Sequence, residues 1–307
     1  MKRKGLVALT LALSIAIVPG FGETSAKTAE LDSQGSEVTI GHELPKAKTK
    51  GKEKFDRPAE VESSSVADVL DEKGKKIGEK KIKKNAEKKA DKLADKQNKK
   101  NAKKQVNEEG ELCILLCGNG GSTGGSGGTT TPTATDASVV TVLIAADEEY
   151  RAAHSDWQTL TQNIVENADN GFTRDHNIDF EIKALGEWTS EGANASEILQ
   201  DMDKDWNGNG YDFVVGFTRD ANFNSGGIAY VYPNSPYGSA VSVNLDQGAT
   251  NTWHAAQHEF SHNYGLNHDA QGSGIKCIMN YDYSYSVDYW DEDHDNLIEA
   301  HKGWYGN

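Results

Sequence analysis

Hydrophobic and polar residues beyond residue 137 alternate with two periodicities, one typical of strands and one typical of helices. Short apolar or alternating runs predict strands at residues 139–145, 178–185 and 213–217. Apolar residues at helical spacing predict a helix after a capping box of Ser155 and Gln158, and a second helix at residues 194–206. The alternation of strand and helix predicts an α/β domain with a mainly parallel sheet.

The same pattern continues to the last residues. Two more strands are predicted at residues 228–232 and 240–245, separated by a loop rich in Pro and Asn. A helix is predicted to begin near Thr250, and another to run from about Asp291 to His301. We therefore expect a twisted sheet of about five strands, flanked by helices.

The first 26 residues have the pattern of a secretory signal peptide. Three basic residues within residues 1–4 precede an apolar run at residues 6–18, and small residues follow at 24–26. The run is too short to span a bilayer comfortably, and no other segment is long and apolar enough. We expect a secreted, extracellular protein without a transmembrane segment in its mature form, or one loosely associated with the cell surface. An N-terminal anchor is the alternative.

Charge divides the remainder of the chain. Residues 27–136 hold 22 basic and 19 acidic residues, whereas residues 137–307 hold 7 basic and 27 acidic ones. The lysines crowd into residues 73–104, which have so few apolar positions that we expect them to be disordered or a solvated helix. A basic segment next to an acidic domain is typical of a prosegment. The alternatives are a charged spacer or an arm that binds an anionic cell-surface polymer. We expect no nucleic acid, because no aromatic residues interleave with the lysines.

Composition thus gives four segments. We predict a signal peptide at residues 1–26, a Lys-rich prosegment at 27–117, a Gly/Thr-rich linker at 118–136 and one folded domain at 137–307.

The strongest chemical signal is the string HEFSHNYGLNH, which begins at His258 and has the spacing HExxHxxGxxH. On a helix, His258 and His262 stand one turn apart on one face and can bind a single ion. Glu259 lies beside that ion and not on it, where its carboxylate can act as a general base toward water.

The second half of the motif supplies the third ligand. Gly265 is expected to end the helix in a left-handed conformation, so that the chain turns and His268 reaches the metal. Three neutral imidazoles leave one tetrahedral position of a zinc ion open, which is typical of a catalytic site. A third ligand from Glu292 or Glu299, as in gluzincins, is a weaker alternative.

The motif is followed by the string CIMNY at residues 277–281, and the two together resemble the metzincin clan of zinc endopeptidases. The resemblance implies that Met279 forms an apolar floor beneath the zinc. Asp269 and the Cys-Ile-Met triplet resemble the bacterial reprolysin or adamalysin type. Tyr281 resembles the tyrosine of astacins and serralysins, which is an extra zinc ligand that moves to stabilise the transition state. A buried tyrosine with a satisfied hydroxyl is the alternative.

The resemblance also implies a metzincin-type catalytic domain, with an antiparallel edge strand at residues 227–232, a zinc-site helix and a C-terminal helix. An extended substrate would pair with the open edge of that strand. The alternative is an edge that is protected and binds no substrate. Cys117-Gly118 resembles the cysteine switch of matrixin and reprolysin prosegments, which implies that Cys117 is an inhibitory zinc ligand in the precursor. The alternative is a disulfide between Cys113 and Cys117, or between either of them and Cys277.

These features predict a secreted zinc metalloendopeptidase that acts on proteins or peptides, made as a latent precursor. Calcium is a second candidate cofactor, because residues 203–208 match the first half of a calcium loop, although Val214 stands where the bidentate glutamate belongs. The alternative function is a non-catalytic, zinc-stabilised protein that binds a surface or mediates adhesion.

Overall fold

The structure of the protein, a computed structural model, describes residues 30–41, 43–52, 55, 61–84 and 137–306. The expected signal peptide and linker, together with Cys113 and Cys117, lie outside these residues. None of the helices within the described ranges is long and apolar enough to cross a membrane.

The described part of the chain is built around a nine-stranded sheet in the order β1-β2-β8-β9-β7-β5-β6-β3-β4. The strands are β1 (Glu30–Leu31), β2 (Glu37–Ile40), β3 (Val61–Leu70), β4 (Lys76–Lys84), β5 (Ser138–Ala146), β6 (Ile178–Glu187), β7 (Phe213–Thr218), β8 (Gly227–Val231) and β9 (Ala240–Leu245). The helices are α2 (Glu148–Ala153), α3 (Trp157–His176), α4 (Ala195–Trp206), α5 (Ala249–Asn263), α6 (Glu292–His301) and a short 3-10 turn, η1 (Lys302–Trp304).

Five strands at the centre of the sheet are those expected from the sequence. β6, β5, β7 and β9 are parallel to one another, and β8 runs antiparallel to β9. This confirms the mainly parallel α/β domain with an antiparallel strand at one side. The sheet nevertheless has nine strands instead of about five, because the N-terminal region adds two strands at each edge.

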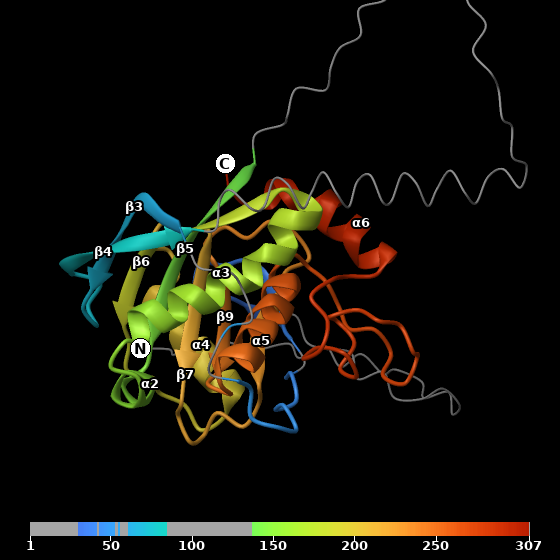
Figure 1. The fold of residues 1–307 in the computed structure, drawn as a ribbon, viewed down its shortest axis with the longest axis horizontal. Helices are drawn as coiled ribbons and strands as arrows, with labels where there is room; N and C mark the ends of the chain where they lie inside the picture. Colours follow the sequence, from blue (N-terminus) through green and yellow to red (C-terminus); the bar gives the residue numbers. More distant parts are fainter. Residues whose placement is uncertain (1–29, 42, 53–54, 56–60, 85–136, 307) are drawn as a thin grey trace, which may run out of the picture.

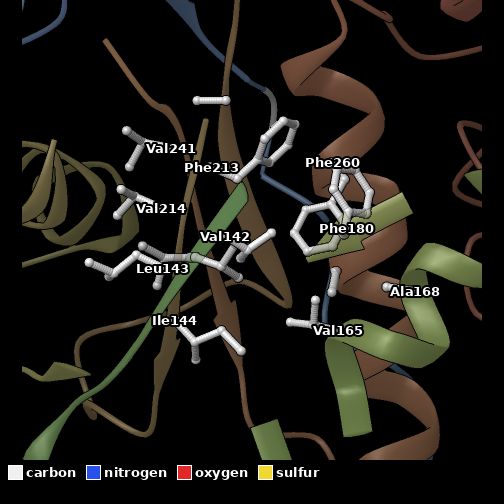
Figure 2. Close-up of a cluster of buried hydrophobic side chains, with 14 of the residues drawn as sticks. Val142, Leu143, Ile144, Val165, Ala168, Phe180, Phe213, Val214, Val241 and Phe260 are labelled. Atoms are coloured by element: carbon white, nitrogen blue, oxygen red, sulfur yellow. The ribbon is translucent and has the colours of Figure 1, made fainter. Parts of the chain in front are cut away.

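Helices cover both faces of the central strands (Figure 1). α3 and α5 lie against each other on one face, and α4 packs on the other. Figure 2 shows Phe180, Phe213 and Phe260 meeting between the sheet and α5, with the Phe180 ring 5.0 Å from that of Phe213 and 5.3 Å from that of Phe260. Val214 points to the opposite face, as successive strand residues do. β7 is buried along its whole length, which explains its continuous apolar run.

The Lys-rich region forms a strand where it is described, so the prediction of disorder or a solvated helix is wrong for residues 76–84. β3 pairs in parallel with β6 and antiparallel with β4. Ala67 and Ile82 are fully buried. A strand added to an existing sheet can bury a few side chains on one face and satisfy its backbone by pairing, so few apolar residues suffice. Lysines on the outer strand β4 also disfavour pairing with another chain.

The opposite edge of the sheet is covered as well. β8 was expected to leave an open edge for substrate, but β2 pairs with it in antiparallel fashion, with Thr39 opposite Val231 and Ile40 opposite Tyr230. β1 pairs in turn with β2. The expected edge strand exists, and the prediction that its outer side is open is wrong for this chain. The partner strand is far away in sequence, so no local pattern could reveal the pairing.

Two helix starts differ in how they are capped. Asn194 caps α4, its side chain accepting a hydrogen bond from Glu197 N at 3.0 Å. The capping box expected at Ser155 and Gln158 is wrong, because α3 begins after Asp156 and that residue makes no side-chain cap hydrogen bond.

The segment considered as a calcium loop is largely helical, because α4 continues through Trp206. The Asp203 carboxylate accepts hydrogen bonds from the backbone N–H and hydroxyl of Ser33 and from the Asn207 side chain, at 2.7–3.0 Å. Burial raises the pKa of Asp203 above its usual value. Asp203 therefore ties the turn after β1 to α4, and the segment is not the open loop that the calcium prediction requires.

Candidate metal centre and active site

α5 carries two of the three motif histidines. His258 and His262 stand one turn apart, both are buried, and their ring centroids are 4.8 Å apart. The end of the helix is fixed to the sheet by Asn263, whose side-chain amide donates to Tyr230 O at 3.0 Å and to Val241 O at 3.1 Å. The spacing of the histidines follows from the helix, and the anchoring by Asn263 gives them a fixed depth in the domain.

Gly265 makes the turn that follows α5. Its φ of 84° lies in the left-handed region, which glycine adopts without steric cost. A Cβ at this position would also lie 2.9 Å from Tyr232 O and 3.2 Å from His301 Nδ1. Both the backbone conformation and the space therefore require glycine. The chain turns back here and brings His268 to the two histidines of α5.

The three histidines converge through the same ring atom. Nε2 of His268 lies 3.0 Å from Nε2 of His258 and 3.0 Å from Nε2 of His262. Nδ1 of His258 is 2.7 Å from Ile278 O, and Nδ1 of His262 is 2.7 Å from Leu266 O. Because a carbonyl can only accept, both Nδ1 atoms must donate, which leaves the Nε2 lone pairs pointing at the shared space.

This donor set fits a zinc ion. Two imidazole nitrogens bound to one tetrahedral zinc lie about 3.3 Å apart, and the measured separations of 3.0 Å are close to that value. Burial lowers the pKa of His258 to about 4, with the Ile278 carbonyl acting in the opposite direction. The ring is therefore neutral near pH 7, as a metal ligand must be.

Glu259 lies in the same buried space. It is fully buried, and neither carboxylate oxygen has a hydrogen-bond partner among the described residues. Burial holds its pKa well above the usual value. A buried carboxyl group without a partner is costly, which indicates that a polar ligand such as water belongs next to it.

Gly227, at the start of β8, makes room for that carboxyl group. A Cβ at Gly227 would lie only 2.5 Å from Glu259 Oε1. Sequence reasoning placed Gly227 in the edge strand but assigned it no part in the site. The only sequence signal was a glycine at the beginning of a strand, which is weak on its own.

Residues 277–280 form the turn expected after the motif, and they support the histidines. Ile278 O accepts from His258, and Met279 O accepts from the N–H of Asp269 at 3.2 Å. Met279 itself is fully buried. Cys277 is a buried free thiol, and the two cysteines considered as its disulfide partners lie outside the described residues. The turn therefore holds both the first histidine and the loop that follows the third.

Tyr281 lies beside the histidines. Its ring centroid is 4.3 Å from that of His268, and its hydroxyl donates to Glu43 O at 3.2 Å. Burial raises the pKa of Tyr281 above its usual value, with the Glu259 and Glu43 carboxylates acting in the same direction. The hydroxyl is therefore protonated at neutral pH and available as a donor.

A second group of metal-ligand type lies behind the turn. Asp269, Cys277, Asp291 and His294 offer ligand atoms that all lie within 4.8 Å of one another. His294 Nε2 donates to Asn267 O at 2.9 Å, and its Nδ1 is 3.1 Å from Asp291 Oδ2 and 3.4 Å from Cys277 Sγ. This donor set is chemically able to hold a metal ion. It also links the loop after His268 to the start of α6, a link that the sequence patterns did not reveal.

The remaining candidates lie elsewhere. Glu299 on α6 is 2.9 Å from His176 Nδ1, and Glu292 is exposed, so neither glutamate belongs to the histidine cluster. Cys117, the expected inhibitory ligand, lies outside the described residues.

Comparison with known proteins identifies a family. The model of metallo-peptidase family M12 matches residues 136–290, which is 155 of the 307 residues and includes all three histidines. Among the curated proteins compared with the chain, none matches it. One similar solved structure, described as "Structure of a chaperone-substrate complex", is 13% identical; the match covers 56% of this chain and 36% of that chain, with a TM-score of 0.40.

Proposed function

Since this chain belongs to metallo-peptidase family M12, we propose that it is a zinc-dependent endopeptidase that cleaves peptide bonds within proteins or peptides. The observation that carries the proposal is the convergence of three Nε2 atoms beside a buried carboxyl group that lacks a partner. A site built only to brace the fold would not need an unpaired carboxyl group next to the metal.

Glu259 is proposed as the general base and then the general acid. It takes a proton from the attacking water and later gives that proton to the leaving amine. When bound, zinc supplies Lewis-acid polarisation of the substrate carbonyl and makes water easier to deprotonate. The support for Glu259 is its burial, its raised pKa and its place directly after the first ligand.

Tyr281 is proposed to stabilise the negative charge that develops on the carbonyl oxygen. Its protonated hydroxyl lies beside His268 and already donates to a backbone carbonyl, that of Glu43. A donor held in place before the reaction needs little reorganisation during it.

The wider setting of the site is also part of the proposal. Residues 1–26 act as a secretory signal, residues 27–117 as a prosegment, residues 118–136 as a linker and residues 137–307 as the peptidase domain. The precursor is latent, and Cys117 is its proposed inhibitory ligand. The chain is then secreted, and the N-terminus of the extracellular form, read by mass spectrometry, tests these assignments.

The variant Glu259→Gln tests the catalytic role. It keeps the size of the side chain and removes the base, so we expect casein hydrolysis to fall by at least about 100-fold. The zinc content, measured by elemental analysis, should remain at the wild-type value because the ligands are untouched.

The exposed Glu191, which lies away from the site, provides the matched control. Glu191→Gln should hydrolyse casein like the wild type. Full activity in Glu259→Gln would contradict the assignment of the base. Zinc binding without hydrolysis in the wild-type enzyme would favour the non-catalytic, surface-binding alternative.

A further inference from the structure

One segment of the N-terminal region lies across the candidate active site. Residues 37–41 and 43–52, here called the cleft segment, follow the outer side of β8 and then pass the start of α5, where they appear in blue (Figure 1). The antiparallel pairing of β2 with β8 continues past Ile40, because Gly41 N donates to Ala229 O at 2.8 Å. The cleft segment therefore approaches the site as an added strand.

The pairing ends at Leu44, directly at the site. Leu44 N donates to Gly227 O at 3.0 Å, and Gly226 N donates to Leu44 O at 2.6 Å. Gly227 is also the residue that touches the Glu259 carboxyl group. The backbone of Leu44 is thus fixed on both sides within the immediate surroundings of the proposed base.

A single peptide group is held at both ends. The carbonyl oxygen of Glu43 accepts from the Tyr281 hydroxyl at 3.2 Å, and the N–H that follows it, on Leu44, donates to Gly227. The ring of Tyr281 lies next to that of His268, with the centroids 4.3 Å apart and the planes tilted by 50°. The Glu43–Leu44 bond therefore lies between the residue proposed to stabilise a carbonyl oxygen and the residue that borders the general base.

Two aliphatic side chains of this segment are buried, Val38 on β2 and Leu44 next to the held bond. Leu44 is only 1% exposed, whereas most side chains of residues 45–52 are exposed. A cavity of roughly 330 Å³ continues from Leu44 along Tyr281 and Tyr285. On the C-terminal side of the held bond, Leu44 is therefore the enclosed side chain.

Beyond Leu44, the cleft segment is held through hydrogen bonds to its backbone groups. Tyr285 donates to Pro45 O at 2.8 Å, and Gln247 accepts from Ala47 N at 2.7 Å. Asn251 donates to Thr49 O at 2.7 Å. Contacts to the backbone are independent of sequence, so the same groove can hold other extended peptides.

We propose that the cleft segment is bound as a substrate and that the Glu43–Leu44 bond is hydrolysed by this chain's own site. This inference rests on the proposed function. It also assigns a substrate class: extended peptides with a leucine-sized aliphatic residue immediately after the cleaved bond. Cleavage separates β2 from the chain that follows and opens the outer edge of β8 to other substrates.

The step is a simple hydrolysis. The oxygen of one water forms a bond to the carbonyl carbon of Glu43, and the bond from that carbon to the Leu44 nitrogen breaks. The nitrogen gains a proton and becomes a new α-amine, while Glu43 ends in a carboxylate. One water is consumed, and no oxidant or further reactant is needed.

The first test follows the purified, zinc-loaded full chain over time by intact mass and N-terminal sequencing, with Cys117→Ala introduced so that the proposed inhibitory thiol does not block the site. A new N-terminus at Leu44 is expected. The masses of the two products, added together, should equal the mass of the precursor plus one water. The chain with Glu259→Gln should stay intact. Cleavage elsewhere, with the Glu43–Leu44 bond preserved, would overturn the inference.

Matched leucine variants test recognition by the groove. Leu44→Asp places a charge in the enclosed position and should leave the bond uncut, whereas Leu31→Asp, at a residue 71% exposed on β1, should be processed like the wild type. If the Leu44→Asp chain were cut before residue 44 at the wild-type rate, the assigned substrate class would be wrong.

Binding can be read without catalysis. In the zinc-free Glu259→Gln chain, hydrogen exchange at the amides of Gly41 and Leu44 should be slow, because both donate to β8. Introducing Leu44→Asp into that chain should speed hydrogen exchange at the backbone amide of residue 44. Fast exchange at both amides in the parent chain would contradict the bound arrangement.

A last arm separates failure of this inference from failure of the proposed function. A recognition sequence for an unrelated protease is inserted after Lys52, and the chain is cut there. If the cut enzyme hydrolyses casein while the uncut chain never breaks at Glu43–Leu44, the inference is wrong and the proposed function stands. If neither the cut nor the uncut form hydrolyses casein in the presence of zinc, both the inference and the proposed function are wrong.

Discussion

Gly227 shows how a residue without a side chain can position a catalytic group. Its Cα faces the Glu259 carboxyl group so closely that a methyl group there would lie 2.5 Å from Oε1. Glu259 cannot move far, because it is fully buried on α5. The absence of a side chain at this point on β8 therefore sets where the proposed base lies.

We predict that Gly227→Ala impairs hydrolysis without unfolding the domain. A shift of the base by about 1 Å is expected to lower kcat/KM by roughly 100-fold. Gly303→Ala, where a Cβ meets nothing within 4 Å, is the control and should be unchanged. Peptide hydrolysis and circular dichroism, measured on both variants, check the outcome, and a fully active Gly227→Ala enzyme would show that the contact has no influence.

Tyr281 offers a second test at the scale of one residue. Tyr281→Phe removes only the hydroxyl, so we expect kcat of the processed enzyme to fall by roughly 100-fold, with little change in KM. Zinc content should not change. If kcat is retained, Tyr281 serves only as a packed residue and as a hydrogen-bond donor to the cleft segment.

At the scale of elements, α5 positions its histidines because its C-terminal end is fixed. Asn263 joins the last turn of the helix to β8 and β9, and Gly265 then reverses the chain. In the turn at residues 277–280, the Ile278 carbonyl accepts a hydrogen bond from His258 and holds its ring in place. Three separate pieces of chain thus fix the orientation of the rings.

The variant Gly265→Ala should be destabilising for two reasons that can be separated. A left-handed alanine costs about 1 kcal/mol, and the clash with Tyr232 O at 2.9 Å is expected to add roughly 1–3 kcal/mol. Gly272 also has a left-handed φ, 77°, but a Cβ there would meet nothing within 4 Å. Gly272→Ala should therefore show only the cost of the left-handed backbone. Denaturant unfolding of both variants measures the difference, and equal losses would rule out a role for the clash.

On the scale of the whole molecule, the N-terminal region and the peptidase domain share one sheet. β1 and β2 extend it beyond β8, and β3 and β4 extend it beyond β6. The acidic domain and the basic segment therefore meet through backbone pairing and through side-chain hydrogen bonds. Ser33 on one side and Asp203 on the other illustrate the contact.

Removing the metal should weaken the entire domain, because three inward-facing imidazoles lose their common partner. With zinc at about 1,000 times its Kd, the expected loss on chelation is roughly 4 kcal/mol of unfolding free energy. Thermal unfolding with and without chelator measures it. His262→Ala should lose the response, and His154→Gln, outside the cluster, should keep it. An unfolding midpoint insensitive to chelator in the wild type would contradict metal binding at these histidines.

The amount that could be predicted differs among the parts of the chain. The strands at residues 139–145 and 240–245 were predicted almost to their ends, because apolar patterns are local and long. The capping box at Ser155 failed, since helix ends depend on backbone geometry that short sequence patterns describe poorly. β4 was missed because its lysines hide its few apolar residues, and β3 because its stability comes from pairing with β6, a strand far away in sequence.

The sequence by itself determined the spacing of His258, Glu259 and His262, because a helix converts a separation of four residues into one turn. Only the tertiary structure decided that Gly227 borders Glu259, that His294 joins the loop after His268, and that Glu43 and Leu44 lie in the site. These contacts join residues far apart along the chain. Their geometry depends on how strands and helices pack together, which no short stretch of sequence encodes.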